Sequence, residues 1–169
     1  MKESKLIEKP LGRKQIITSS LSLKKENQLI DRINEKIKNS SSKFYWVCPL
    51  IEESEELDLK AAEERYKILK KHFKNKVLLM HGRLSEIEKE EIMTKFKNED
   101  YKILVSTTVI EVGVDIPSAT TIVIEHAERF GLAQLHQLRG RVGRNDIQSY
   151  CILLHKDNIG EISKQRIDI

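Results

Sequence analysis

Residues 44–50, Phe-Tyr-Trp-Val-Cys-Pro-Leu, form an almost continuous apolar run. A strand with one face in water alternates apolar and polar residues, whereas a strand that is covered on both faces does not. Strands covered on both faces are typical of parallel sheets, and Pro49 ends this one because proline cannot donate to a strand ladder. The run therefore predicts a buried strand of a mostly parallel β-sheet.

Further short β-prone runs lie on both sides of this one along the chain. Each is rich in β-branched, aromatic or other apolar residues, as strands are. The additional strands are predicted at 15–21, 77–81, 101–106, 121–125 and 150–154.

Three stretches between these runs carry apolar residues at the spacing of an amphipathic helix. Two of them cover about 24–38 and 59–73. The third begins with the capping box Ser85-Glu86-Ile87-Glu88, in which the serine and the second glutamate satisfy each other's backbone N–H groups. The side chains expected to face the core are Ile30, Ile33, Ile37, Leu59, Ala62, Tyr66, Leu69, Phe73, Ile87, Met93 and Phe96.

Strands that alternate with helices of this length imply βαβ units joined by right-handed crossovers. The predicted fold class is therefore α/β, a mostly parallel sheet with helices on both faces. The chain has 169 residues, of which 39% are hydrophobic and 33% charged, which suits one globular domain. We assign the domain to residues 15–155, a polar linker to 1–14, and the start of a following segment to 156–169.

Composition excludes several classes of protein. Cys48 and Cys151 each lie inside an apolar run, so two buried thiols and a cytoplasmic location are expected rather than a disulfide framework. The five histidines show no metal-ligand spacing, so no metal site is predicted. No apolar run has the length of a membrane span, and no membrane partner is expected. The net charge of +4 permits a polyanionic partner.

Residues 130–144, Phe-Gly-Leu-Ala-Gln-Leu-His-Gln-Leu-Arg-Gly-Arg-Val-Gly-Arg, contain no acidic residue. Leu132, Leu135 and Leu138 recur every third position, as one buried helical stripe would. We therefore predict a helix that starts after Gly131, packs through its leucines and ends in a glycine-rich turn.

Arginines and glycines alternate in that turn, at Arg139, Gly140, Arg141, Gly143 and Arg144. The planar guanidinium group binds phosphate oxygens in pairs, and glycine lets the backbone approach a ligand closely. The pattern favours a phosphate site over the alternative, a solvated basic face.

Other candidate residues follow predicted strands, and ligands gather at the carboxyl ends of strands in open α/β sheets. Arg83 follows the strand at 77–81, Thr107 and Thr108 follow the strand at 101–106, and the arginine stretch follows the strand at 121–125. We therefore expect all of them along one edge of the domain.

The two threonine hydroxyls suit a nucleic-acid backbone phosphate, although β propensity or a helix cap explains them nearly as well. Glu111 and Asp115 are poorly placed as an acid–base pair because Gly113 lies between them. Asp115 is instead a candidate acceptor for the hydroxyls of a ribose.

The chain has no glycine–lysine pair, and hence no P-loop, and no Asp-Glu pair of the magnesium-binding kind. If this domain acts on a nucleoside triphosphate, it therefore supplies only part of the triphosphate-binding site. Its arginines would then act as fingers offered to another domain, where they stabilise charge on the transferred phosphoryl group.

These residues also match a known family. Residues 137–144, Gln-Leu-Arg-Gly-Arg-Val-Gly-Arg, resemble motif VI of superfamily 2 helicases, and 103–117 resembles their motif V. With 46–55, the His-Gly-Arg of 81–83 and 128–138, the chain resembles the RecG-type ATP-dependent DNA helicases from about residue 10 to 155.

The resemblance implies a RecA-like domain, the second of two motor domains. ATP and Mg²⁺ are then held mainly by the first motor domain, which this chain lacks. The predicted catalytic residues, which reach that ATP, are Arg141 and Arg144. The residues predicted at the nucleotide are Gly113, Asp115 and Gln137. The predicted DNA contacts are Arg83, Thr107 and Thr108.

The function implied is translocation on double-stranded DNA at branches, in stalled-fork regression and Holliday junction migration during recombination and repair. The implied partners are branched DNA and the N-terminal motor and wedge domains of the same protein, so the chain is expected to be a piece of a longer one. Two alternatives remain: a transcription-repair coupling translocase, which is similar over 130–144, and a nucleic-acid-binding module of the same fold without a motor.

Overall fold

The structure is a computed structural model that describes residues 16–49, 55–107, 116–142 and 147–156. Six strands form one sheet in the order β1-β6-β5-β2-β4-β3, and every neighbouring pair is parallel. The prediction of a mostly parallel sheet is confirmed. The strands are β1 (Ile17–Ser22), β2 (Lys43–Val47), β3 (Val77–Met80), β4 (Ile103–Ser106), β5 (Ala119–Ile124) and β6 (Tyr150–His155).

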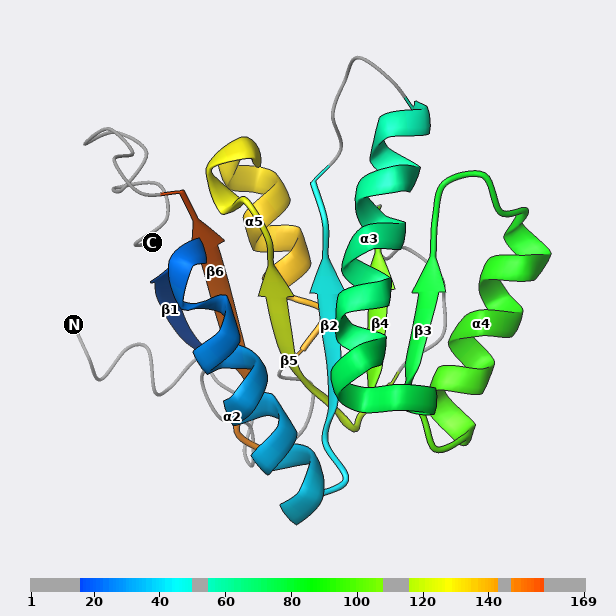
Figure 1. The fold of residues 1–169 in the computed structure, drawn as a ribbon, viewed down its shortest axis with the longest axis horizontal. Helices are drawn as coiled ribbons and strands as arrows, with labels where there is room; N and C mark the ends of the chain where they lie inside the picture. Colours follow the sequence, from blue (N-terminus) through cyan, green and yellow to red (C-terminus); the bar gives the residue numbers. More distant parts are fainter. Residues whose placement is uncertain (1–15, 50–54, 108–115, 143–146, 157–169) are drawn as a thin grey trace, which may run out of the picture.

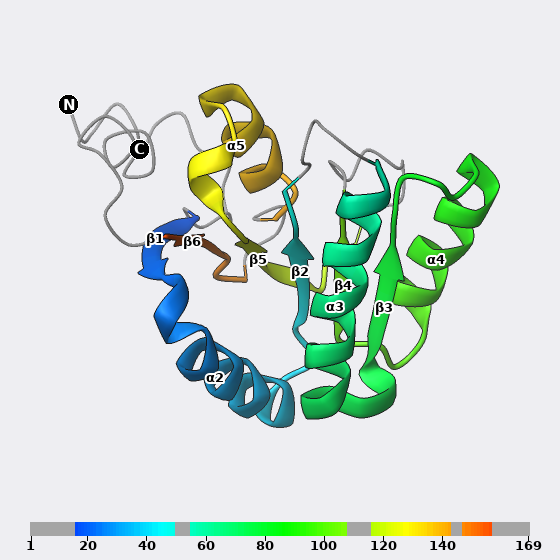
Figure 2. The ribbon, with the colours of Figure 1, turned by 45° about the horizontal axis from the view of Figure 1, so that its top comes forward.

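Helices cover both faces of this sheet (Figures 1 and 2). Residues of α2 and α3 share a hydrophobic cluster with one face, and residues of α4 and α5 share a second cluster with the other. Short 3₁₀ turns precede α2, follow α3 and precede α5. The helices are α2 (Glu26–Asn39), α3 (Glu55–Phe73), α4 (Glu86–Asn98) and α5 (Leu132–Arg139), and the turns are η1 (Leu23–Lys25), η2 (Lys74–Lys76) and η3 (Ala127–Arg129).

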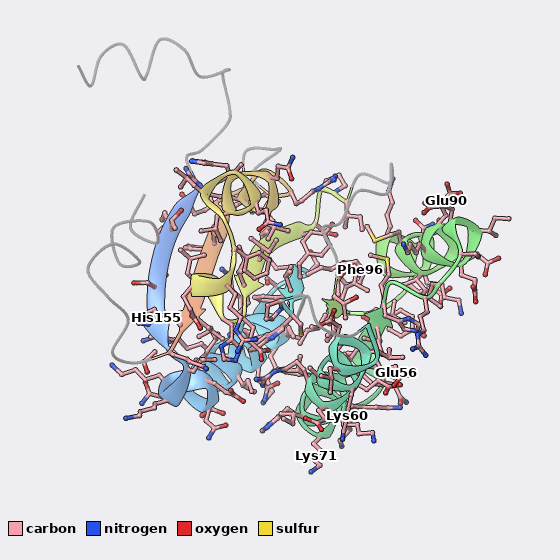
Figure 3. All side chains as sticks on the ribbon, turned by 90° about the horizontal axis from the view of Figure 1, so that it is seen from above. Glu56, Lys60, Lys71, Glu90, Phe96 and His155 are labelled. Atoms are coloured by element: carbon pink, nitrogen blue, oxygen red, sulfur yellow. The ribbon has the colours of Figure 1, made fainter. Side chains whose placement is uncertain are left out.

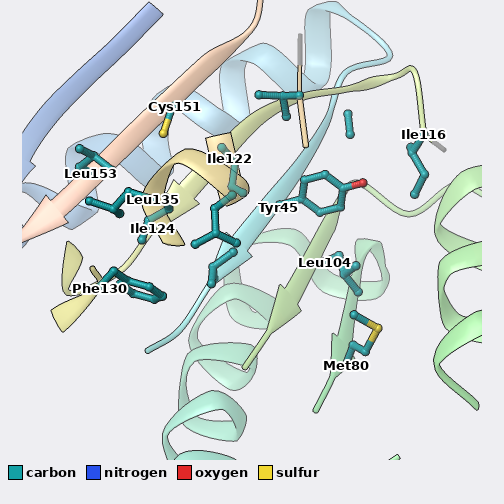
Figure 4. Close-up of a cluster of buried hydrophobic side chains, with 14 of the residues drawn as sticks. Tyr45, Met80, Leu104, Ile116, Ile122, Ile124, Phe130, Leu135, Cys151 and Leu153 are labelled. Atoms are coloured by element: carbon teal, nitrogen blue, oxygen red, sulfur yellow. The ribbon is translucent and has the colours of Figure 1, made fainter. Parts of the chain in front are cut away.

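Strand β2 supplies both clusters, as its apolar run predicts. Phe44 and Trp46 pack on the α2–α3 face, whereas Tyr45 and Val47 pack on the α4–α5 face, because successive side chains of a strand point to opposite sides. All four are buried. Figure 4 shows Tyr45 within the cluster on the α4–α5 face.

Most of the helix residues whose spacing predicts that they face the core are indeed buried. Ile37, Leu59 and Tyr66 are half-buried. In the view from above (Figure 3), Phe96 lies between α4 and the sheet, while Lys60 and Lys71 on α3 and Glu90 on α4 project outward. The fully buried members of the predicted set are Ile30, Ile33, Ala62, Leu69, Phe73, Met93 and Phe96.

The prediction for Ile87 was wrong, since its side chain is 70% exposed. Ile87 precedes Met93 by six residues, which is about 1.7 turns, so the two side chains lie on different sides of α4. The capping box is confirmed. Glu88 N–H donates to Ser85 Oγ at 3.1 Å, and Ser85 N–H donates to Glu88 Oε1 at 3.0 Å. These bonds favour the carboxylate and lower the pKa of Glu88.

A buried arginine, which the sequence pattern did not predict, ties α2 and α3 to the sheet. Arg65 of α3 is 8% exposed. Its Nε donates to Glu125 Oε1 at 2.8 Å, and its two terminal nitrogens donate to the carboxylate oxygens of Glu26 at 2.6 and 3.0 Å. Trp46 Nε1 donates to the same Glu125 oxygen at 2.8 Å. One guanidinium group thus joins α2, α3, β2 and the residue after β5.

The charges in this network compensate one another. Burial opposes the charge on Arg65, but hydrogen bonds to Glu26 and the nearby charge of Glu125 outweigh it and raise the pKa of the guanidinium group. The guanidinium carbon also lies 4.9 Å from the centre of the Trp46 ring. Removal of Arg65 would leave both carboxylates without their cation, with Glu125 in a poorly solvated position.

We predict that Arg65→Met lowers the free energy of unfolding by about 3 kcal/mol, because it leaves Glu125 without its cation. Urea unfolding followed by circular dichroism measures the change. Lys60→Met, on the exposed side of the same helix, is the matched control and should stay within about 0.5 kcal/mol of the parent. If Arg65→Met unfolds at the same urea concentration as Lys60→Met, the network does not stabilise the fold.

Candidate functional site

The carboxyl ends of all six strands lie at one edge of the sheet, the upper edge in Figure 1. At this edge the ends of β3 and β4 are adjacent, since Met80 pairs with Ser106. Thr107 N–H donates to the carbonyl oxygen of Met80 at 3.2 Å. The loop that carries Arg83 therefore begins next to Thr107 at the carboxyl edge, as predicted.

Arg83 is available to an anion at this edge. Its side chain is 46% exposed, and its Nη2 lies 3.8 Å from Glu56 Oε1 on α3. An exposed ion pair at this distance holds the arginine only weakly. The backbone is better fixed, because Arg83 N–H donates to His81 Nδ1 at 3.2 Å.

Thr107 is less open than its predicted contact with DNA requires. It exposes 3% of its surface, and its amide is already bonded to Met80. The contact between Thr107 and a DNA phosphate therefore stays a prediction. Thr108, Gly113, Asp115 and Arg144 lie outside the described residues, as do Glu111 and Gly143.

Helix α5 begins at Leu132, directly after Gly131, as predicted. Leu135 and Leu138 are buried against the sheet, together with Val142. Leu132, however, is 46% exposed, so the predicted stripe of three leucines was wrong at its first position. A spacing of three falls short of a full turn of 3.6 residues, so the first and third leucines point in different directions.

The end of α5 fixes the backbone around Arg141. Gly140 N–H donates to His136 O at 3.1 Å, and Arg141 N–H donates to Leu138 O at 3.0 Å. Arg141 thus lies between two buried residues, Leu138 and Val142, while its own side chain is half-buried. It forms no ion pair with any carboxylate in the described part of the chain. Its guanidinium group is therefore not neutralised by any described residue.

Gly140 is not required by the domain itself. Its φ of −70° and ψ of −5° are open to any residue. A Cβ atom there would lie 3.5 Å from the carbonyl oxygens of His136 and Gln137, which is an ordinary contact. Gln137 is exposed on the last turn of the helix. An exposed Gln137 next to a glycine that the fold does not require is compatible with the close approach of a ligand that the alternation of glycine and arginine predicts.

The expectation that all candidate residues share one edge was wrong. Helix α5 runs from the carboxyl edge back along the face of the sheet, so its end lies part-way across that face (Figure 1). Ile116 precedes β5 and lies at the amino edge, where Lys43 N–H donates to Ser118 O at 2.8 Å. The reason is geometric: in a parallel sheet, each connection has to return from one edge to the other. Arg83 and Thr107 thus follow strand ends at the carboxyl edge, whereas Gln137 and Arg141 belong to the end of α5.

A polar cluster at the carboxyl ends of β5 and β6 was missed. Glu128 Oε2 lies 3.2 Å from His126 Nδ1, and Glu128 Oε1 accepts from Lys156 N–H at 3.3 Å. Burial alone would raise the pKa of Glu128, but backbone hydrogen bonds and His126 lower it. His126 has a left-handed backbone, with φ of 52°, a conformation that is uncommon outside glycine although histidine adopts it more often than most residues. The cluster holds the chain that leaves β6 against the connection after β5.

Both cysteines are free and buried, as predicted. Burial raises the pKa of the Cys151 thiol to about 12 and that of Cys48 well above its usual value. A thiol that stays protonated is a poor nucleophile. Neither cysteine therefore suits covalent catalysis.

In the part of the chain that the structure describes, no three metal-binding side chains gather into a possible site. Across the same residues, no helix combines the length and the apolar character needed to cross a bilayer.

Comparison with protein families matches residues 24–146 to the helicase conserved C-terminal domain. Among curated proteins, the chain is 46% identical over 163 residues to the ATP-dependent DNA helicase RecG of Pasteurella multocida, covering 96% of this chain and 24% of that protein. It is 52% identical over 153 residues to RecG of Aquifex aeolicus, covering 90% of this chain and 19% of that protein. The chain thus spans about a quarter or less of the length of these relatives.

Among solved structures, the chain matches RecG bound to a three-way DNA junction with a TM-score of 0.80 and 44% identity, over 95% of this chain and 21% of that one. It also matches domain 2 of the DEAD-box helicase Mss116p bound to an RNA duplex, with a TM-score of 0.67 and 22% identity, over 85% of this chain and 55% of that one. The second match supports the fold alone.

We predict that Gly140→Ala raises the free energy of unfolding by roughly 0.5 kcal/mol, because its backbone conformation suits alanine and the unfolded chain loses freedom. Urea unfolding of the 169-residue chain measures it. Ala133→Gly in the same helix is the converse control and should cost about 1 kcal/mol. A loss of several kcal/mol in Gly140→Ala would mean that the glycine serves the fold and not a ligand.

Proposed function

This chain belongs to the helicase conserved C-terminal domain family, and we propose that it is the second motor domain of a RecG-type ATP-dependent DNA translocase. Its substrate would be branched double-stranded DNA, at stalled replication forks and Holliday junctions during recombination and repair. The relatives at 46% and 52% identity are RecG helicases, which favours RecG over a transcription-repair coupling translocase. A cytoplasmic location belongs to the same proposal.

The observation that carries the proposal is the setting of Arg141. The arginine is fixed by backbone bonds at the end of α5, between buried Leu138 and Val142, and no carboxylate of the described residues neutralises it. Arg65 shows the contrast, since two internal carboxylates hold it. A rigidly held arginine without an internal partner suits an anion that arrives from another domain.

The anion would be the phosphate chain of ATP, bound with Mg²⁺ mainly by the first motor domain. ATP supplies the phosphoanhydride bond whose hydrolysis drives movement. Arg141 and Arg144 would bind its phosphates, and Gln137, Gly113 and Asp115 would lie near the nucleotide. An arginine donates to the phosphate oxygens and so offsets the charge that develops there.

DNA would bind at the carboxyl edge of the sheet. Arg83 lies exposed there beside the buried Thr107, and its charge suits a contact with a backbone phosphate. Together with Thr108, these residues would touch the DNA backbone. The nucleotide contacts would then belong to the end of α5 and the DNA contacts to the loops after β3 and β4, and closure of the motor domains would couple them. Recognition of the branch would belong to the wedge domain of the same protein.

We predict that the purified 169-residue chain does not hydrolyse ATP, with or without forked DNA, because it has no P-loop to hold the phosphates. A coupled phosphate-release assay measures turnover. The proposal that this chain supplies only part of the ATP site would be refuted by DNA-stimulated ATPase activity that co-elutes with the chain on gel filtration and is lost in Arg141→Ala.

In the longer protein that contains this chain, we predict that Arg141→Ala or Arg144→Ala lowers kcat for ATP hydrolysis about a thousandfold or more. Fork binding and the melting temperature should be nearly unchanged, because Arg141 forms no ion pair with the part of the chain that the structure describes. Lys71→Ala, an exposed cation on α3, is the control for loss of charge and should keep its ATPase activity. Near-normal turnover in both arginine variants would overturn their catalytic role.

A further inference from the structure

A cavity of about 160 Å³ opens between α2 and the sheet. It lies on the face opposite α5, where α2 crosses β5 and β6 near their amino ends (Figure 1). Its walls come from α2 and from three neighbouring strands, β2, β5 and β6. None of the residues proposed above for nucleotide or DNA binding lines it.

The floor of the cavity is one row across the sheet. Phe44 pairs with Thr121, and Thr121 pairs with Tyr150, so the three side chains point to the same side. Two of the three are aromatic, and Ile33 of α2 adds to the apolar wall. Apolar cavities of about 150 Å³ accommodate a benzene ring. The volume and lining therefore suit a single six-membered ring.

One polar group in the floor is left without a partner. Thr121 exposes 2% of its surface, and its Oγ1 has no hydrogen-bond partner within the described chain. A buried hydroxyl without a partner is costly, and a threonine hydroxyl can both donate and accept. A polar atom of a ligand in the cavity would satisfy it.

Two cations line the cavity from the side of α2. Arg32 and Lys36 are four residues apart, so they lie on the same side of the helix. Lys36 Nζ lies 4.0 Å from the centre of the Tyr150 ring. Neither side chain forms an ion pair with another described residue. Burial lowers the pKa of Lys36, and a neighbouring anion would reverse that penalty.

We infer that this cavity binds a small organic carboxylate built on a single ring. The ring lies against Phe44 and Tyr150, and the carboxylate lies between Arg32 and Lys36, within reach of the Thr121 hydroxyl. A phosphate or sulfate ion fits less well, because the lining is mainly apolar and leaves much of the cavity unfilled. The site is independent of the motor role proposed above.

The first test compares benzoate with benzamide, which has the same shape and no charge, by amide NMR titration of the 169-residue chain. Benzoate should shift amides of α2, β5 and β6 and saturate in the millimolar range or below. Benzamide should bind about tenfold more weakly, because it loses the charge-assisted bonds. Equal binding of the two, shifts confined to other surfaces, or an absence of saturation would overturn the proposal.

Variants then test the individual contacts. Lys36→Met and Arg32→Gln should each weaken benzoate about tenfold, whereas Lys38→Met, an exposed lysine of the same helix outside the cavity, should leave it unchanged. Thr121→Val keeps the shape and removes the orphan hydroxyl, so it should raise the melting temperature and weaken benzoate several-fold. Parent-like affinity in Lys36→Met and Arg32→Gln would refute the site. A more stable Thr121→Val chain with unchanged affinity would refute the part assigned to the hydroxyl.

Discussion

Every strand of the sheet enters at one edge and leaves at the other, so each connection has to carry the chain back across a face. This constraint places helices on both faces and makes the inner strands apolar on both sides. Strand β2 meets it most fully, with Trp46 on one side and Tyr45 on the other, both buried. It also means that the described candidate residues do not all belong to one edge, because α5 runs back from the carboxyl edge across a face of the sheet.

Two arginines illustrate how the fold assigns different roles to the same side chain. Arg65 is enclosed by Glu26, Glu125 and the Trp46 ring, so its charge is used to hold α2, α3 and the sheet together. Arg141 is held just as firmly through its backbone, yet no described carboxylate pairs with it. The first arginine holds elements of the domain together, whereas the second has no ion pair with any described residue. Net charge does not distinguish the two; only the neighbours do.

Sequence patterns predicted the strands, the parallel sheet, the start of α5 and the capping box at Ser85, because each depends on residues close together in the chain. Patterns failed at Ile87 and Leu132, where a spacing of three or six was taken for a single helical face. The Arg65 network was not predicted, because its members are 39 and 60 residues apart in sequence. The left-handed backbone of His126 was also not predicted, since positive φ is rare in any non-glycine residue, even though histidine is enriched there.

The sequence by itself determined the α/β class, the approximate boundaries of most elements and the segment 130–144, whose arginine-rich end resembles a motif of the helicase family. Local spacing and residue type are enough for these, because backbone preferences act over a few residues. The tertiary structure decided which charges are paired, that Arg83 and Arg141 lie in different parts of the domain, and that a row of Phe44, Thr121 and Tyr150 floors a cavity. These depend on strand order and on the return of each connection across the sheet, which bring together residues that are far apart in the chain.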